Sequence, residues 1–155
     1  MTANGLQVLI FVIAVTLQPR ATAGPTVVFV CEHGAAKSVI ATMYFDKIAA
    51  ERGLRARAIY RGVNPQADLS VTALKGLRDD GFTTPDRKPS AISQADIESA
   101  TIIFAIGCSL PASATASGKS ASWDDVPDDQ GYGPTRDAIK KHVEQLVDDL
   151  LKKQR

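Results

Sequence analysis

The chain has few cysteines, few histidines and almost no net charge. Its 155 residues include two cysteines and two histidines, and 18 basic and 17 acidic residues leave a net charge of +1. Two cysteines far apart in the sequence, with no histidine pair near them, exclude the usual zinc motifs. A near-neutral chain has no broad positive field for nucleic acid or an anionic membrane. We therefore expect no metal, no cofactor and no nucleic-acid partner, and any anion site has to be local.

The N-terminal apolar run is too short to span a membrane. Residues 6–17 are mostly apolar but fall short of the roughly 20 residues that cross a bilayer as a helix. An A-x-A pattern ending at Ala23 follows, which is typical of a signal-peptidase site, although no Lys or Arg precedes the run. We predict a signal peptide over 1–23 and a periplasmic or secreted domain over 24–155, with no membrane contact after cleavage. An uncleaved anchor and a misassigned start are the alternatives.

Beyond Gly24 the hydrophobic pattern alternates between strand and helix, and 45% hydrophobic residues are enough for one domain. Apolar runs predict strands over 26–30, 56–62 and 101–107. Helical spacing predicts three helices, over about 36–53, 70–81 and 134–153. The second helix should begin after Ser70 as N-cap and end at Gly81, with Val71, Leu74 and Leu77 on one face. This order predicts an α/β fold, with a mainly parallel sheet and helices on both faces.

Cys31 follows the first strand, in the stretch VVFVCEHGAAKS. If the second and third strands flank the first with right-handed crossovers, a crevice opens at the carboxyl end of the first strand, beside Cys31. Gly34 can adopt a positive φ, and the small side chains of Ala35 and Ala36 let backbone amides converge on a ligand. Together with the start of the next helix, these amides predict an anion site that favours the thiolate of a cysteine.

The segment CEHGAAKS resembles the phosphate-binding loop of the low-molecular-weight protein tyrosine phosphatases and of the arsenate reductases built on that fold. Their signature is Cys, five residues, Arg and Ser, and the likeness continues through residues 60–108 and an acidic loop at 123–129. It implies a flavodoxin-like, three-layer sandwich with a four-stranded, mainly parallel sheet in the order 2-1-3-4. It also implies a phosphate-binding loop made of Glu32, His33, Gly34, Ala35, Ala36, Lys37 and Ser38.

The resemblance implies catalytic roles as well. Cys31 matches the nucleophile that forms a phosphocysteine, and Ser38 matches the hydroxyl that hydrogen-bonds its thiolate. The general acid should come from the acidic loop, where Asp128 is the first choice, Asp125 the second and Asp124 a further candidate. The family places this aspartate before a proline, and no Asp-Pro pair occurs in the loop. A solvated acidic loop without a catalytic role is the alternative.

Lys37 stands where the signature has arginine. An ammonium keeps the positive charge but lacks the planar fork that grips two phosphate oxygens. The chain can therefore be a slow phosphatase or a non-catalytic oxyanion-binding module. A third alternative is that Lys37 has no role in the site and is simply solvated at the start of the helix. Three other residues have open or simple interpretations. His33 either packs in the turn or contacts the ligand, and Tyr132 either forms an aromatic wall of the pocket or anchors the last helix. His142 is expected on the surface.

Cys108 follows the third strand and suggests a redox alternative. On neighbouring strands, Cys31 and Cys108 would lie near enough for a disulfide in an oxidising compartment, whereas a buried structural thiol is the alternative. Arsenate reductases of this fold need a second thiol, and some have it at this position. The sequence thus predicts a hydrolase of small or aryl phosphate monoesters, of the protein tyrosine phosphatase type. The enzyme alternative is an arsenate reductase that uses both cysteines and a thiol reductant.

Overall fold

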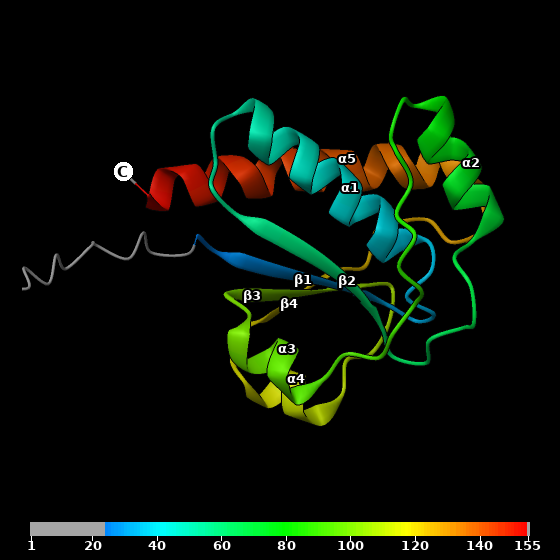
Figure 1. Ribbon diagram of the computed structural model, residues 1–155. Coiled ribbons are helices and arrows are strands. Elements are labelled where there is room, and N and C mark those ends of the chain that lie inside the picture. Colours follow the sequence, from blue (N-terminus) through cyan, green and yellow to red (C-terminus); the bar gives the residue numbers. More distant parts are fainter. Residues whose placement is uncertain (1–23, 155) are drawn as a thin grey trace, which may run out of the picture.

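A single parallel sheet forms the centre of the molecule in the computed structural model, which describes residues 24–154. The predicted signal peptide, residues 1–23, lies outside the described residues. The strands are arranged in the order β2-β1-β3-β4, as the resemblance implied (Figure 1). Their bounds are β1 Thr26–Cys31, β2 Arg57–Gly62, β3 Ile102–Ile106 and β4 Ser120–Trp123.

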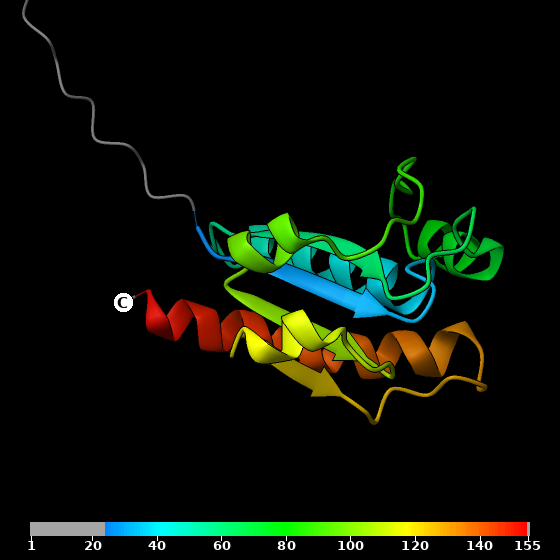
Figure 2. The same ribbon diagram turned by 90° about the horizontal axis from the view of Figure 1, so that it is seen from below.

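Helices cover both faces of the sheet and complete three layers (Figure 1). One face carries α1 (Lys37–Glu51), α2 (Val71–Asp79) and α5 (Tyr132–Lys153), and the other carries α3 (Gln94–Ser99) and α4 (Ala112–Ala116). Seen from below, α1 and α5 run behind the sheet and α3 and α4 lie in front of it (Figure 2). Within residues 24–154, no helix has the length and apolar character needed to cross a membrane.

Strand β1 is buried on both faces because it lies between the two helical layers. Side chains alternate along a strand, so Phe29 and Cys31 pack in the larger core under α1 and α5, and Val28 and Val30 pack in the smaller core under α3 and α4. The ring centroids of Phe29 and of Trp123, on the edge strand β4, lie 5.4 Å apart. Burial of each such side chain contributes about 1.5–3 kcal/mol, which fixes the strand that leads into Cys31.

The structure differs from the sequence pattern in its shortest elements. Strand β4 has four residues and α4 has five, so neither repeats its hydrophobic period often enough to be recognised. The expected shared face of Val71, Leu74 and Leu77 is not the packed face of α2. Val71 begins the helix at the rim and is 79% exposed, whereas Leu77 is fully buried together with Ala73.

Candidate functional site

A pocket of about 620 Å³ opens at the carboxyl end of β1. Its lining comes from four parts of the chain that meet there: the loop after β1, the start of α2, the turn after β3, and the acidic loop with the first turn of α5. This is the crevice that the strand order predicts, because the chain leaves the neighbouring strands β1 and β3 toward opposite edges of the sheet. The residues that carry polar or reactive groups into it include Cys31, Glu32, His33, Lys37, Asp128 and Tyr132.

The loop after β1 is held by its carbonyl groups. The carbonyl oxygens of Cys31, Glu32 and His33 accept hydrogen bonds of 3.1, 2.8 and 3.2 Å from backbone amides of the segment after β2, and the oxygen of Ala35 accepts one of 3.0 Å from Ser70. The amides of residues 33–37 donate no hydrogen bond to another group within the described part of the chain. The loop therefore offers a row of unpaired N–H groups at a helix N-terminus, which is the arrangement that binds phosphate-like anions.

Two glycines allow this loop to lie against β2. Gly34 has a φ of +62°, and a Cβ on it would lie 2.7 Å from the backbone nitrogen of Gly62. A Cβ on Gly62 would in turn lie 2.8 Å from the backbone nitrogen of Gly34. Both positions therefore need glycine. The need for Gly62 could not be predicted from the motif, because this residue lies outside the loop.

Cys31 and Ser38 are in contact beneath the loop. The Sγ atom of Cys31 lies 3.1 Å from the Oγ atom of Ser38, and both residues are almost fully buried. The hydroxyl can donate to the sulfur, and a donated hydrogen bond stabilises a thiolate more than a thiol. The structure therefore brings together the two residues that the resemblance pairs.

The side chain of Lys37 lies inside the pocket and is not solvated as a lysine at a helix start would be. It is only 12% exposed, and its ammonium forms an ion pair with the carboxylate of Asp128, which is 71% exposed. Gly107 makes room for it, because a Cβ at residue 107 would lie 2.5 Å from the Lys37 nitrogen. The positive charge is thus held inside the pocket, directly beside the acidic loop.

Of the candidate acids, only Asp128 lies in the pocket. Asp125 is directed elsewhere: its Oδ1 lies 2.7 Å from Nε2 of His142, and this hydrogen bond lowers the pKa of Asp125. Asp124 accepts a hydrogen bond of 2.8 Å from Ser122. The structure therefore brings Asp128, the first choice from the sequence, into the pocket and does not bring Asp125 or Asp124 there.

The two histidines have structural contacts. His142, expected on the surface, is 28% exposed and stacks on Trp123 with ring centroids 4.8 Å apart. His33 lines the pocket, and its Nδ1 also lies 3.2 Å from the carbonyl oxygen of Asn64. His33 is therefore held within the turn and also lines the pocket, where its contact with a ligand stays a prediction.

Cys108 lies on the other face of the sheet from Cys31. Strand alternation would put Cys108 on the face of Phe104 and Ile106, which is also the face of Cys31, but Gly107 has a φ of +59° and turns the chain. Cys108 therefore packs against the smaller core, with its Sγ 3.5 Å from the carbonyl oxygen of Val30. It lines a separate cavity of about 360 Å³, and burial raises the pKa of its thiol to about 11. Both cysteines are free thiols in the structure, and they pack in different cores on opposite faces of the sheet.

Comparison with known proteins supports the resemblance. No family model matches the chain. A protein of Halobacterium salinarum named "Putative arsenate reductase" is 26% identical over 126 residues, which cover 79% of this chain and 88% of that protein. The chain is thus similar in sequence to this protein over most of its length.

Solved structures share the fold over most of this chain. YfkJ from Bacillus subtilis has a TM-score of 0.74 at 20% identity, covering 87% of this chain and 99% of that one. A low-molecular-weight phosphotyrosine phosphatase from Vibrio cholerae has a TM-score of 0.71 at 19% identity, covering 84% and 99%. A thioredoxin-dependent arsenate reductase from Corynebacterium glutamicum has a TM-score of 0.59 at 19% identity, covering 86% and 63%. The chain therefore has the fold of the low-molecular-weight protein tyrosine phosphatases and of the arsenate reductases that share it.

Proposed function

We propose that the chain is a phosphatase of aryl phosphate monoesters that works through a phosphocysteine. One observation carries the proposal: a single pocket combines a buried cysteine bonded to a serine hydroxyl, a row of unpaired amides, a lysine ammonium and an aspartate. These are the nucleophile, the oxyanion donors, the cation and the acid that phosphoryl transfer to a thiolate requires. The apolar part of the same pocket, formed by Ile40, Pro127 and Tyr132, suits the aryl group.

In the first step the thiolate of Cys31 attacks phosphorus while the amides of residues 33–37 bind the non-bridging oxygens. The bond from phosphorus to the phenolic oxygen breaks, and protonated Asp128 gives its proton to that oxygen. In the second step the Asp128 carboxylate takes a proton from water as the water oxygen attacks phosphorus. Inorganic phosphate leaves, and the hydroxyl of Ser38 donates to the departing thiolate.

Lys37 has two partners in this scheme. In the free protein its ammonium is paired with Asp128, and a bound phosphate dianion competes for the same ammonium. Binding of substrate therefore loosens Asp128 from Lys37 and lets it turn toward the leaving group. Because the ammonium offers no planar fork, turnover should be slower than with arginine, and loss of one well-placed transition-state donor costs about 10²–10³ in rate.

Arsenate reduction is the second candidate, favoured by the name of the relative from Halobacterium salinarum. Cys31 would displace a hydroxyl from arsenate, and Cys108 would then attack the sulfur of Cys31. The arsenic would leave as arsenite, reduced from As(V) to As(III), and a thiol reductant would reopen the disulfide. Cys108 lies on the opposite face of the sheet, so this route needs the turn after β3 to reorganise. Binding of an oxyanion without turnover is the non-enzymatic alternative.

Export is a further part of the proposal. A signal peptide over residues 1–23 would place the activity in the periplasm or outside the cell, on phosphate monoesters present there. Sequencing the N-terminus of the protein purified from its own cells tests this, with a start near Gly24 expected.

Hydrolysis of an aryl phosphate by the purified protein, compared with Cys31→Ser, tests the proposed function. We expect turnover that the serine variant lacks and that inorganic phosphate inhibits. Protection of Cys31 by phosphate without any turnover would support the oxyanion-binding alternative in its place. Arsenite production that depends on a thiol and on Cys108 would support the reductase.

A further inference from the structure

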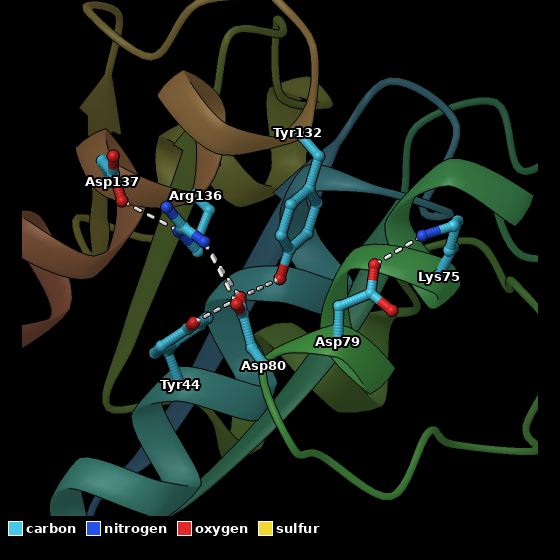
Figure 3. Close-up of polar contacts among 7 residues, drawn as sticks. All are labelled: Tyr44, Lys75, Asp79, Asp80, Tyr132, Arg136 and Asp137. Atoms are coloured by element: carbon cyan, nitrogen blue, oxygen red, sulfur yellow. Dashed lines mark hydrogen bonds and ion pairs between the residues drawn. The ribbon is translucent and has the colours of Figure 1, made fainter.

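A polar cluster lies where α1, the end of α2 and the start of α5 meet (Figure 3). Asp80, directly after α2, accepts hydrogen bonds from the hydroxyls of Tyr44 (2.8 Å) and Tyr132 (2.7 Å). It also accepts one of 3.1 Å from the guanidinium of Arg136. We call these four residues the Asp80 cluster. It joins α1, the end of α2 and the first turn of α5 through one carboxylate.

The cluster fixes the ring of Tyr132. The ring lies directly on Gly76 of α2, where any Cβ would overlap it, and the Arg136 guanidinium lies 5.6 Å from the ring centroid. The hydroxyl is bound by Asp80, so the phenol is held along its face and at its tip. Since Tyr132 also lines the pocket, the two alternatives for this residue, pocket wall and helix anchor, are both true of it.

The same turn of α5 holds the acidic loop. The hydroxyl of Thr135 donates a hydrogen bond of 3.0 Å to the carbonyl oxygen of Pro127, the residue before Asp128. Thr135 and Tyr132 both line the pocket from the start of α5. The position of the first turn of α5 therefore sets the aromatic wall and one end of the loop that carries the candidate acid.

Asp80 has the environment of a fixed anion. Its side chain is 21% exposed, and its two oxygens accept bonds from three donors. Burial alone would raise the pKa of Asp80, but the hydrogen bonds from Tyr132 and Tyr44 and the charge of Arg136 outweigh it and lower that pKa. In return, burial and the hydrogen bond to Asp80 raise the pKa of Tyr44 to about 12 and raise that of Tyr132 further.

We propose that Asp80 is a positioning residue for the pocket, which holds the ring of Tyr132 in place as the wall that contacts the aryl group of the substrate. This inference rests on the proposed function for the identity of the substrate. Asp80 itself does not line the pocket and acts only through Tyr132. The cluster therefore tunes preference for an aryl group over a bare oxyanion and leaves the anion loop unchanged.

The test compares Asp80→Asn with Asp79→Asn. Asp79 is the neighbouring residue but pairs with Lys75 on the outer side of α2, at 2.6 Å, and takes no part in the cluster (Figure 3). Protection of Cys31 from an alkylating agent measures the affinities of phenyl phosphate and inorganic phosphate without requiring turnover. The ratio of the two affinities measures how much the ring of Tyr132 contributes to binding of the phenyl group.

We expect Asp80→Asn to reduce the preference for phenyl phosphate about 3- to 10-fold, the size of one aromatic contact, with the affinity for inorganic phosphate unchanged. Tyr132→Phe, which keeps the ring and loses its bond to Asp80, should do the same and keeps the test valid if Asp80→Asn does not fold. Asp79→Asn should not change the ratio. Ultraviolet titration should show tyrosine ionisation at lower pH in Asp80→Asn than in Asp79→Asn.

An unchanged ratio in Tyr132→Phe and Asp80→Asn, or an equal loss of affinity for both anions, would overturn the proposal. The outcome is separable from that of the proposed function. A protein that prefers phenyl phosphate in a manner that depends on Asp80 but does not hydrolyse it would contradict the phosphatase assignment alone. A protein that hydrolyses aryl phosphates with the same ratio in all variants would contradict the role of Asp80 alone.

Discussion

The backbones of Gly34 and Gly62 lie against each other so closely that neither residue has room for a side chain. Gly62 is the last residue of β2, and it supports the anion loop from behind while the following segment binds the loop's carbonyl groups. The direction of the loop amides therefore depends on the end of β2 as much as on the loop's own sequence.

Gly62→Ala should weaken phosphate binding at least tenfold, because a new Cβ displaces Gly34 and misplaces the amides, and small misplacements at a site cost up to about 10²-fold. Gly53→Ala is the control: its φ of +72° makes alanine strained there, at about 1 kcal/mol or more, but no atom lies near and the site is distant. Phosphate protection of Cys31 is the measurement. Equal phosphate affinity in both variants would show that β2 does not support the loop.

Lys37→Met should lower aryl phosphate turnover by about 10²–10³, since it removes the charge in the pocket and keeps the apolar stem. Gly107→Ala should lower turnover as well, because its Cβ would take the place of the ammonium. The kinetic constants of both variants provide the check. A wild-type rate in Lys37→Met would mean that the ammonium serves only to hold Asp128.

Asp128→Asn should reduce turnover by about 10²–10⁴, and more for phenyl phosphate than for a substrate with an acidic leaving group that needs no proton. Asp125→Asn is the matched control, because Asp125 is bound to His142 and lies outside the pocket. Turnover of two substrates with different leaving groups distinguishes the variants. A larger loss in Asp125→Asn than in Asp128→Asn would contradict the assignment of the acid.

Cys108 should react slowly with alkylating agents at neutral pH. Burial raises the pKa of its thiol to about 11, so the reactive thiolate is scarce at every pH well below that value and increases only as the pH rises toward it. Cys108→Ser should accordingly keep aryl phosphate turnover. Peptide mapping after mild oxidation should find no bond between Cys31 and Cys108, and a linked peptide would restore the redox alternative.

Much of the fold could be predicted from the sequence because its long elements repeat their periods. The helix expected over 134–153 is α5, whose apolar residues from Ile139 to Leu150 are buried at helical spacing, and the run before Cys31 is an interior strand. The position of Cys108 could not be predicted, since it depends on the turn that Gly107 makes after β3. Nor could the bond of Tyr132 to Asp80, because no local pattern relates residues so far apart in the sequence.

The sequence also left the identity of the general acid open, because the four aspartates of the acidic loop at 123–129 differ in their position along the loop and not in their chemistry. Asp125 is drawn away by His142 on α5, a contact set by helix packing, and Asp128 stays over Lys37. The sequence shows that a lysine replaces the signature arginine. The burial of this lysine against Gly107 could be seen only in the structure.

Trapping the covalent intermediate tests the central claim most directly. Asp128→Asn, mixed with an aryl phosphate labelled on phosphorus and quenched within the first turnover, should carry the label on the sulfur of Cys31, because the variant lacks the base that activates water for the second step. The same variant that also carries Cys31→Ser should form no phosphocysteine. Label on another residue, or turnover without any label on Cys31, would contradict the proposed mechanism.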